Sequence, residues 1–172
     1  MSEPFTAPTI VPLAVRSAGD GVLFEAARAL KAKKWRKAER LCRQVLRIDP
    51  NHPTAVHLLG LAAHRGGHVF DALSLLRRSI ELDESQPIWW FNLGVSCAAG
   101  DRHAEATECY RAALRLQPYL VPALFMLGRS LQTMGLLDDA AAALAQVLRI
   151  EPGHEEAASL LQSITRDLRD AA

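Results

Sequence analysis

Several features that mark membrane or secreted proteins are missing from this sequence. No apolar run reaches the length of about 18 residues that a helix needs to cross a bilayer. The first four residues lack the basic start and apolar stretch of a secretory signal. The three cysteines, Cys42, Cys97 and Cys109, form no CxxC pair, which is typical of free thiols in a reducing compartment. We therefore expect a cytoplasmic protein without membrane insertion.

The sequence also has little net charge. Its 20 Lys and Arg against 19 Asp and Glu give +1, which disfavours a generic nucleic-acid binder. The charge is uneven, because residues 19–52 hold nine Lys and Arg against four Asp and Glu. The basic run comprises Lys31, Lys33, Lys34, Arg36, Lys37, Arg40 and Arg43. A solvated face is the simpler interpretation; an acidic partner or a nucleic acid is the alternative, and nucleic-acid binding would weaken steeply with salt.

Catalytic signatures are absent as well. The sequence has no glycine-rich dinucleotide or phosphate loop, no HExxH and no GxSxG. His57, His64 and His68 have the spacing of zinc ligands on one continuous helix. Gly66 and Gly67 are expected to end that helix before His68, and no cysteine or carboxylate completes the set. We expect a non-catalytic protein with no metal and no cofactor.

What the sequence does contain is a repeat with a period of about 34 residues. Three glycines, each preceded by leucine, recur at this spacing: Gly60, Gly94 and Gly128. A second series is formed by alanines: Ala38, Ala72, Ala106 and Ala140. A third is formed by prolines: Pro50, Pro118 and Pro152. Three series with one period indicate an array of equal structural units.

Each unit reads as a pair of helices. Apolar residues recur at helical spacing over 54–66 and again over 70–83, with Gly66 and Gly67 between them, and no segment alternates as a strand does. A glycine or alanine on the first helix lets the second approach closely. A larger side chain there would overpack the pair, at a cost of about 1–3 kcal/mol. A proline then ends the second helix. The pattern predicts an all-α fold of helical hairpins.

The third unit has the fullest motif, with Trp90, Leu93, Gly94, Ala106, Tyr110 and Pro118. This pattern resembles the tetratricopeptide repeat (TPR) family. The resemblance covers residues 19–154 and is weakest in the first unit, where Glu25 replaces the leucine. It implies a right-handed α-solenoid of four TPR helical hairpins plus a C-terminal capping helix. The expected TPR domain, 19–172, comprises repeats 19–52, 53–86, 87–120 and 121–154 and a capping helix 155–172, and it follows a proline-containing tail, 1–18.

In this family the first helix of each hairpin lines a concave groove that commonly binds a peptide. The resemblance places thirteen candidate partner-binding residues there: Leu23, Ala27, His57, Leu61, His64, Arg65, Ile88, Phe91, Asn92, Val95, Phe125, Met126 and Arg129. Many are apolar, and an exposed apolar patch usually marks an interaction site. We expect a protein or peptide segment with apolar anchors as the partner. The alternative is that tight coiling, or the chain's own tail, buries these residues.

The function predicted from the sequence is a protein–protein interaction scaffold. Two known modes of the family are disfavoured, because only Asn92 fits either the carboxylate clamp of chaperone-binding members or the asparagine ladder of glycosyltransferase-linked members. A cytoplasmic secretion-type chaperone and a recognition subunit that presents substrates to a separate enzyme stay open as alternatives. Self-association stays open too, as does the tail, either an extended strip on a groove or a disordered segment.

Overall fold

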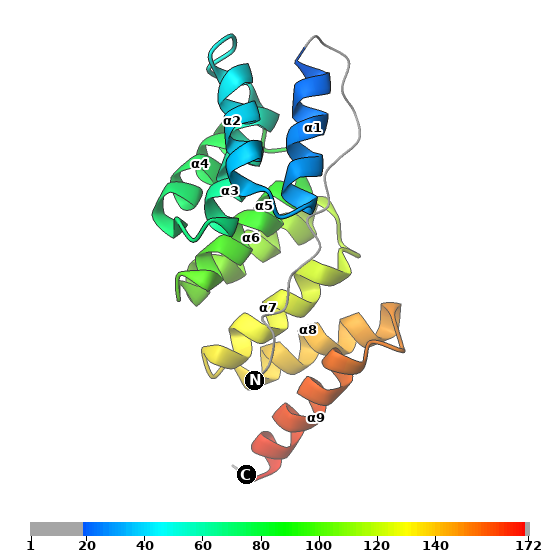
Figure 1. The fold of residues 1–172 in the computed structure, drawn as a ribbon. Coiled ribbons are helices and arrows are strands. Elements are labelled where there is room, and N and C mark those ends of the chain that lie inside the picture. Colours follow the sequence, from blue (N-terminus) through cyan, green and yellow to red (C-terminus); the bar gives the residue numbers. More distant parts are fainter. Residues whose placement is uncertain (1–18, 171–172) are drawn as a thin grey trace. The chain divides into compact units, whose positions relative to one another are not determined.

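The computed structural model describes residues 19–170 and contains only helices and their connections in that range (Figure 1). This confirms the predicted all-α class. The predicted tail, 1–18, and the last two residues of the expected capping helix lie outside the described residues. Within the described part, no helix is both long enough and apolar enough to span a membrane.

The chain divides into two compact units, one up to Glu84 and one from Ser85 onward. Unit 1 contains α1 (Asp20–Lys31), α2 (Trp35–Leu46), α3 (Pro53–Arg65) and α4 (Val69–Leu82). Unit 2 contains α5 (Pro87–Ala99), α6 (His103–Leu116), α7 (Val121–Thr133), α8 (Leu137–Ile150) and α9 (Glu155–Asp170).

The helix ends follow local chemistry. Proline occupies the first turn of α3, α5 and α7, where a missing N–H costs nothing. Nδ1 of His154 accepts a hydrogen bond from the Ala157 amide at 3.3 Å and caps the start of α9. The hairpin turns are also periodic, because left-handed backbone recurs at the same position of every repeat. The residues with positive φ are Lys33 (57°), Gly67 (84°), Asp101 (60°) and Gly135 (76°).

The two helices of each hairpin meet at the glycines of the repeat. A Cβ added at Gly94 would lie 2.5 Å from Cε1 of Tyr110, and one added at Gly60 would lie 2.9 Å from Cγ of Leu76. Gly128 faces Leu144 in the same way. The predicted close approach is therefore confirmed at these three positions. A large side chain on the second helix fills the space that the glycine leaves.

In the first hairpin, different residues allow the close approach of the two helices. Ala26 and Cys42, at the register of the glycine and of its large partner, are both completely buried. Cys42 is much smaller than Leu or Tyr, so the methyl group of Ala26 is accommodated without strain. The volume of the pair, rather than glycine itself, is what the hairpin requires.

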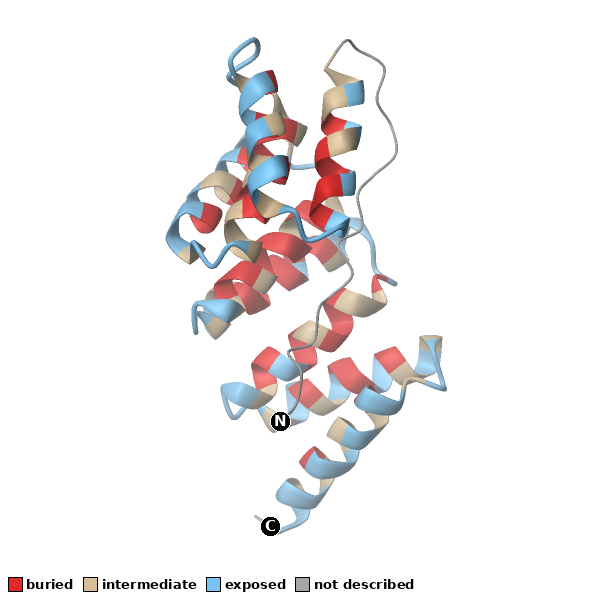
Figure 2. Ribbon diagram, in the orientation of Figure 1, coloured by how far each residue is buried: buried red, intermediate tan, exposed pale blue. Residues whose placement is uncertain are grey.

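Packing within each unit continues from one hairpin to the next. In unit 1, α2 packs on α1 and on α3, and α1 also contacts α3. In unit 2, α6 packs on α7, α8 packs on α9, and α5 contacts α7. The buried faces of these helices form the cores of the two units (Figure 2). In each unit, the first helices of consecutive hairpins are therefore neighbours.

Candidate functional site

The predicted partner-binding residues all lie on the first helices of the hairpins. They are Leu23 and Ala27 on α1; His57, Leu61, His64 and Arg65 on α3; Ile88, Phe91, Asn92 and Val95 on α5; and Phe125, Met126 and Arg129 on α7. His57, Phe91 and Phe125 occupy the same register in successive repeats. Since α1 contacts α3 and α5 contacts α7, each unit brings its own members of the set together.

The expectation that the apolar members form an exposed patch is wrong. Leu61 is 5% exposed, Phe91 1% and Phe125 4%. The other buried members are Leu23, Ala27, His57, Ile88 and Asn92. These side chains are covered by the chain itself, so they support a surface instead of forming it. Their role in partner binding stays a prediction.

Neighbouring elements explain how the two phenylalanines are covered. The ring of Phe91 lies 6.0 Å from the ring of Tyr110 on α6. The ring of Phe125 lies 4.9 Å from the imidazole of His154, the residue that caps α9. Aromatic pairs at these separations contribute about 0.5–1.5 kcal/mol beyond the area that they bury. Both phenylalanines are therefore core residues of unit 2.

The open part of the predicted set is more polar. His64, Arg65, Val95 and Met126 are half-buried, and Arg129 is exposed. The guanidinium carbon of Arg129 lies 5.9 Å from the centre of the Phe125 ring, which is cation–π distance. Its Nη1 also approaches the Met126 sulfur at 4.0 Å. Arg129 is thus a cation held in place over an apolar base.

His57 is a buried imidazole in unit 1. Its Nδ1 lies 3.3 Å from the hydroxyl of Ser79, which itself donates to the carbonyl of Leu76 at 2.7 Å. The hydroxyl therefore accepts from an Nδ1–H group of His57. Burial lowers the pKa of His57 to about 3, so the side chain is neutral at physiological pH. Burial, and then the charge of Arg65, lower the pKa of His64 as well.

The thiols and histidines make no site of their own. Cys42, Cys97 and Cys109 are free and buried, and burial raises the pKa of Cys42 to about 12. His68 lies between α3 and α4, off the helix that carries His57 and His64, as expected from the two glycines. Within residues 19–170, no group of three His, Cys, Asp or Glu side chains is arranged to hold a metal ion.

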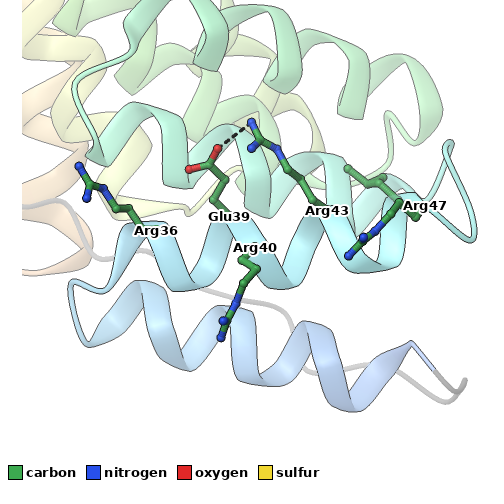
Figure 3. Close-up of a pocket in the computed structure, with 6 residues that line it drawn as sticks. Arg36, Glu39, Arg40, Arg43 and Arg47 are labelled. Carbon is green, nitrogen blue, oxygen red and sulfur yellow. Dashed lines mark ion pairs between the residues drawn. The ribbon is translucent and has the colours of Figure 1, made fainter.

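A second surface lies on the outer side of α2. Arg36, Arg40 and Arg43 project from this helix and, with Arg47 at its C-cap, Glu39 and Leu46, line a shallow hollow (Figure 3). All four arginines are exposed, as are the lysines of the predicted basic run. Glu39 forms an ion pair of 2.7 Å with Arg43. The basic run is therefore exposed to solvent.

A hollow of about 690 Å³, lined by both apolar and charged residues, adjoins this face, and sequence reasoning did not find it. We call it the α2–α4 hollow. Its lining is Trp35, Arg36, Glu39 and Arg43 from α2; Leu59, Ala62 and Ala63 from α3; Gly66 and His68 from the turn; and Asp71, Ser74 and Leu75 from α4. The one feature of the sequence that pointed to this hollow was Trp35, an aromatic residue inside a basic run.

Comparison with known protein families bears directly on this architecture. A model described as tetratricopeptide repeat matches residues 25–87 and 67–120, and a second model of the same description matches residues 98–164. The chain belongs to the tetratricopeptide repeat family. The TPR motif predicted from the sequence is thereby confirmed.

Individual relatives are more distant. The chain is 24% identical to the N-terminal acetyltransferase A complex auxiliary subunit NAA15 of Arabidopsis thaliana. The 127 residues that match make up 74% of this chain and 14% of that protein. It spans about a sixth or less of the length of the curated relatives that it matches.

Two solved structures have the same fold. The crystal structure of MamA superposes with a TM-score of 0.77 at 24% identity, covering 91% of this chain and 89% of that one. YrrB, described as a TPR protein with an unusual peptide-binding site, superposes with a TM-score of 0.75 at 18% identity, covering 86% of this chain and 76% of that one. At these identities the likeness concerns the fold.

Proposed function

We propose that this TPR chain is a non-catalytic scaffold that holds a segment of a partner polypeptide against the first helices of its hairpins. The observation that carries the proposal is the pairing of first helices within each unit, α1 with α3 and α5 with α7. Such a pairing presents side chains of one register as a preformed surface, which lowers the ordering cost of binding. The peptide-binding site named for YrrB, a protein of the same fold, supports this function.

The open residues of the first helices suggest what the partner offers. In unit 2, Val95 and Met126 are half-buried and Arg129 is exposed over the Phe125 ring. Small apolar side chains of a partner would pack on Val95 and Met126, and a carboxylate would bond the guanidinium of Arg129. The buried Phe91 and Phe125 would hold this surface in shape. The partner is thus a segment with modest apolar anchors and some negative charge.

A peptide selection tests this proposal. Twelve-residue peptides are selected from a random library on the wild-type chain, and their Kd is measured by fluorescence polarisation. Arg129→Ala and Val95→Asp should each weaken the selected peptides roughly tenfold, because each removes or repels an anchoring contact. Arg111→Ala, an exposed arginine of α6, is the matched control and should change Kd less than about twofold. Selected peptides that bind all three variants alike would show that the first helices are not the binding face.

A second candidate role is the recognition part of an enzyme complex. The similarity to an acetyltransferase auxiliary subunit over 74% of this chain favours it. In this role the same surface would present a substrate to a catalytic chain. Affinity purification from the native source should then yield a catalytic subunit in stoichiometric amount, and Arg129→Ala should raise the KM of that enzyme with little change in kcat. Purification of the chain without such a subunit would remove this role.

A further inference from the structure

The outer face of α2 carries a continuous row of arginines. Arg36, Arg40, Arg43 and Arg47 follow one another at spacings of four, three and four, which places them on one side of the helix. The row is about 16 Å long at 1.5 Å per residue. All four side chains are exposed (Figure 3). The four side chains start from one side of the helix but their guanidinium groups point in different directions (Figure 3), and each can form bidentate bonds with a carboxylate.

The arginines are only partly neutralised. Glu39 pairs with Arg43 at 2.7 Å. Arg36, Arg40 and Arg47 have no ion pair with any residue of the described range 19–170. Like charges one turn apart on a helix destabilise it by about 0.2–0.5 kcal/mol per pair. The stability of α2 therefore does not account for the row.

The repeats themselves show that the fold does not need these arginines. The equivalent positions are Phe70, Ser74, Arg77 and Glu81 on α4; Ala104, Glu108, Arg111 and Arg115 on α6; and Asp138, Ala142, Ala145 and Arg149 on α8. Each second helix packs in its own hairpin in the same way, yet none of the other three repeats the row. The arginines are therefore particular to α2 and not a requirement of the hairpin.

The α2–α4 hollow gives the row an apolar neighbour. Leu59, Ala63 and Leu75 are half-buried at its base, and Trp35 lies at the start of α2. Arg36 and Arg43 line both this hollow and the shallow one on the outer face of α2. A single bound segment can therefore contact the apolar base and the arginines together.

We propose that the α2–α4 hollow and the arginine row form a second docking surface, which binds an acidic polypeptide segment through one apolar anchor. The anchor packs on Ala63 and Leu75 beside Trp35. Carboxylates of the segment bond Arg36 and Arg40, which have no ion-pair partner in the described part of unit 1. Charge complementarity identifies this occupant, because a cationic row bordering a hollow with an apolar base fits an acidic segment that carries an apolar anchor.

A polypeptide fits this surface better than a nucleic acid does. The phosphate backbone of a nucleic acid could bond the arginines, but it carries no apolar side chain that would fill the hollow. The apolar base formed by Leu59, Ala63 and Leu75 would have no counterpart in that backbone. The arginine row also lies on a second helix, away from the first-helix residues of the proposed function.

The test uses defined probes. A fluorescein-labelled twelve-residue peptide of Asp and Glu with two adjacent leucines at its centre is compared with the same peptide carrying serines instead, and with a 20-nucleotide single-stranded DNA. Fluorescence anisotropy is measured on the full chain. We expect the leucine peptide to bind at least about tenfold more tightly than the serine peptide, because only the former fills the hollow.

Three variants locate the binding. Arg36→Glu with Arg40→Glu should weaken the leucine peptide roughly tenfold or more. Ser74→Trp fills the hollow from an exposed position of α4 and should weaken the leucine peptide about fivefold while leaving the serine peptide unchanged. Arg111→Glu with Arg115→Glu makes the same charge change at the register of Arg43 and Arg47 on α6, and should alter Kd less than about twofold. Circular dichroism verifies that each variant is folded.

Several outcomes would overturn the proposal. Equal affinity for the leucine and serine peptides would mean that the hollow plays no part. Tighter binding of the DNA would assign the row to nucleic acid. Equal loss in the α2 and α6 variants, or no binding of the leucine peptide by the wild-type chain at millimolar concentration, would remove the site. Because none of these variants alters a first helix, the result is separate from that of the proposed function.

Discussion

Units 1 and 2 are built by the same packing rule but differ in charge and in a buried histidine that only unit 1 has among the described residues. The sequence up to Glu84 carries thirteen Lys and Arg against nine Asp and Glu, whereas the rest carries seven against ten. At the register where unit 2 has Phe91 and Phe125, unit 1 has Leu23 and His57. The shared packing shows that each hairpin requires a small residue fitted to its partner on the next helix. The differences show which positions can vary in charge and polarity without changing the fold.

The largest difference in stability between the two units is expected at acidic pH. Burial lowers the pKa of His57 to about 3 in the folded chain, against 6.5 as the ordinary value. As the pH falls below 6.5, the unfolded chain takes up a proton that the folded chain rejects, so stability is lost over the window from 6.5 down to about 3. We expect unit 1 to lose roughly 3 kcal/mol at pH 4. This loss of stability is measured by hydrogen exchange and mass spectrometry on peptides from α3 and α4.

His57→Phe is the control for this prediction, because it places the residue of unit 2 at the same register in unit 1. The variant should lose most of the pH dependence in α3 and α4, while peptides of α5 and α6 keep the behaviour of the wild-type chain. An unchanged profile in the variant would show that another group, and not His57, makes unit 1 sensitive to acid.

The next largest changes in stability are expected from substitutions at the glycines between paired helices. Gly94→Ala should destabilise unit 2 by about 2 kcal/mol, because the new Cβ would meet the buried Tyr110 ring at 2.5 Å. Gly60→Ala should cost less in unit 1, about 1 kcal/mol, because Leu76 is flexible and alanine favours the helix. Urea unfolding followed by circular dichroism checks both values.

The matched control for the glycine series is Gly21→Ala on α1. Nothing lies within 4 Å of a Cβ added there, so the change should stabilise the chain by up to about 1 kcal/mol. A cost at Gly21 similar to that at Gly94 would mean that steric contact between the helices is not what the glycines provide.

The smallest effect is expected at the arginine row. Arg36→Ala and Arg40→Ala should each change the free energy of unfolding by less than about 0.5 kcal/mol, because both side chains are exposed and lack an ion pair in the described residues. Thermal unfolding measures this. A loss above about 1 kcal/mol in either variant would show that the row stabilises α2, and the contrast between α2 and the other second helices would then be structural.

Much of the hairpin architecture could be predicted from the sequence. The spacing of Gly60, Gly94 and Gly128 predicts close helix pairs, and Gly66 and Gly67 predict the break before His68. The period of the turns was less visible, because only two of its four positive-φ residues are glycines. Local rules reach this far because each hairpin is built from residues that lie within a single repeat of the sequence.

The site was less accessible to sequence reasoning. Helical spacing assigns Phe125 to one side of α7, but it does not reveal that His154, which directly precedes α9, covers the ring. The α2–α4 hollow was also invisible, because its lining comes from three helices and a turn whose separation depends on how the hairpins pack.

The sequence by itself determined that this protein is an array of helical hairpins, since a small residue and its partner on the next helix set how closely two helices meet. Tertiary structure alone decided which first-helix residues are sealed and which stay open, as with Phe91 and Arg129. Periodicity defines the side of a helix that a residue occupies. Burial depends on the neighbour that lies against that side, and the neighbour is placed only when the hairpins pack.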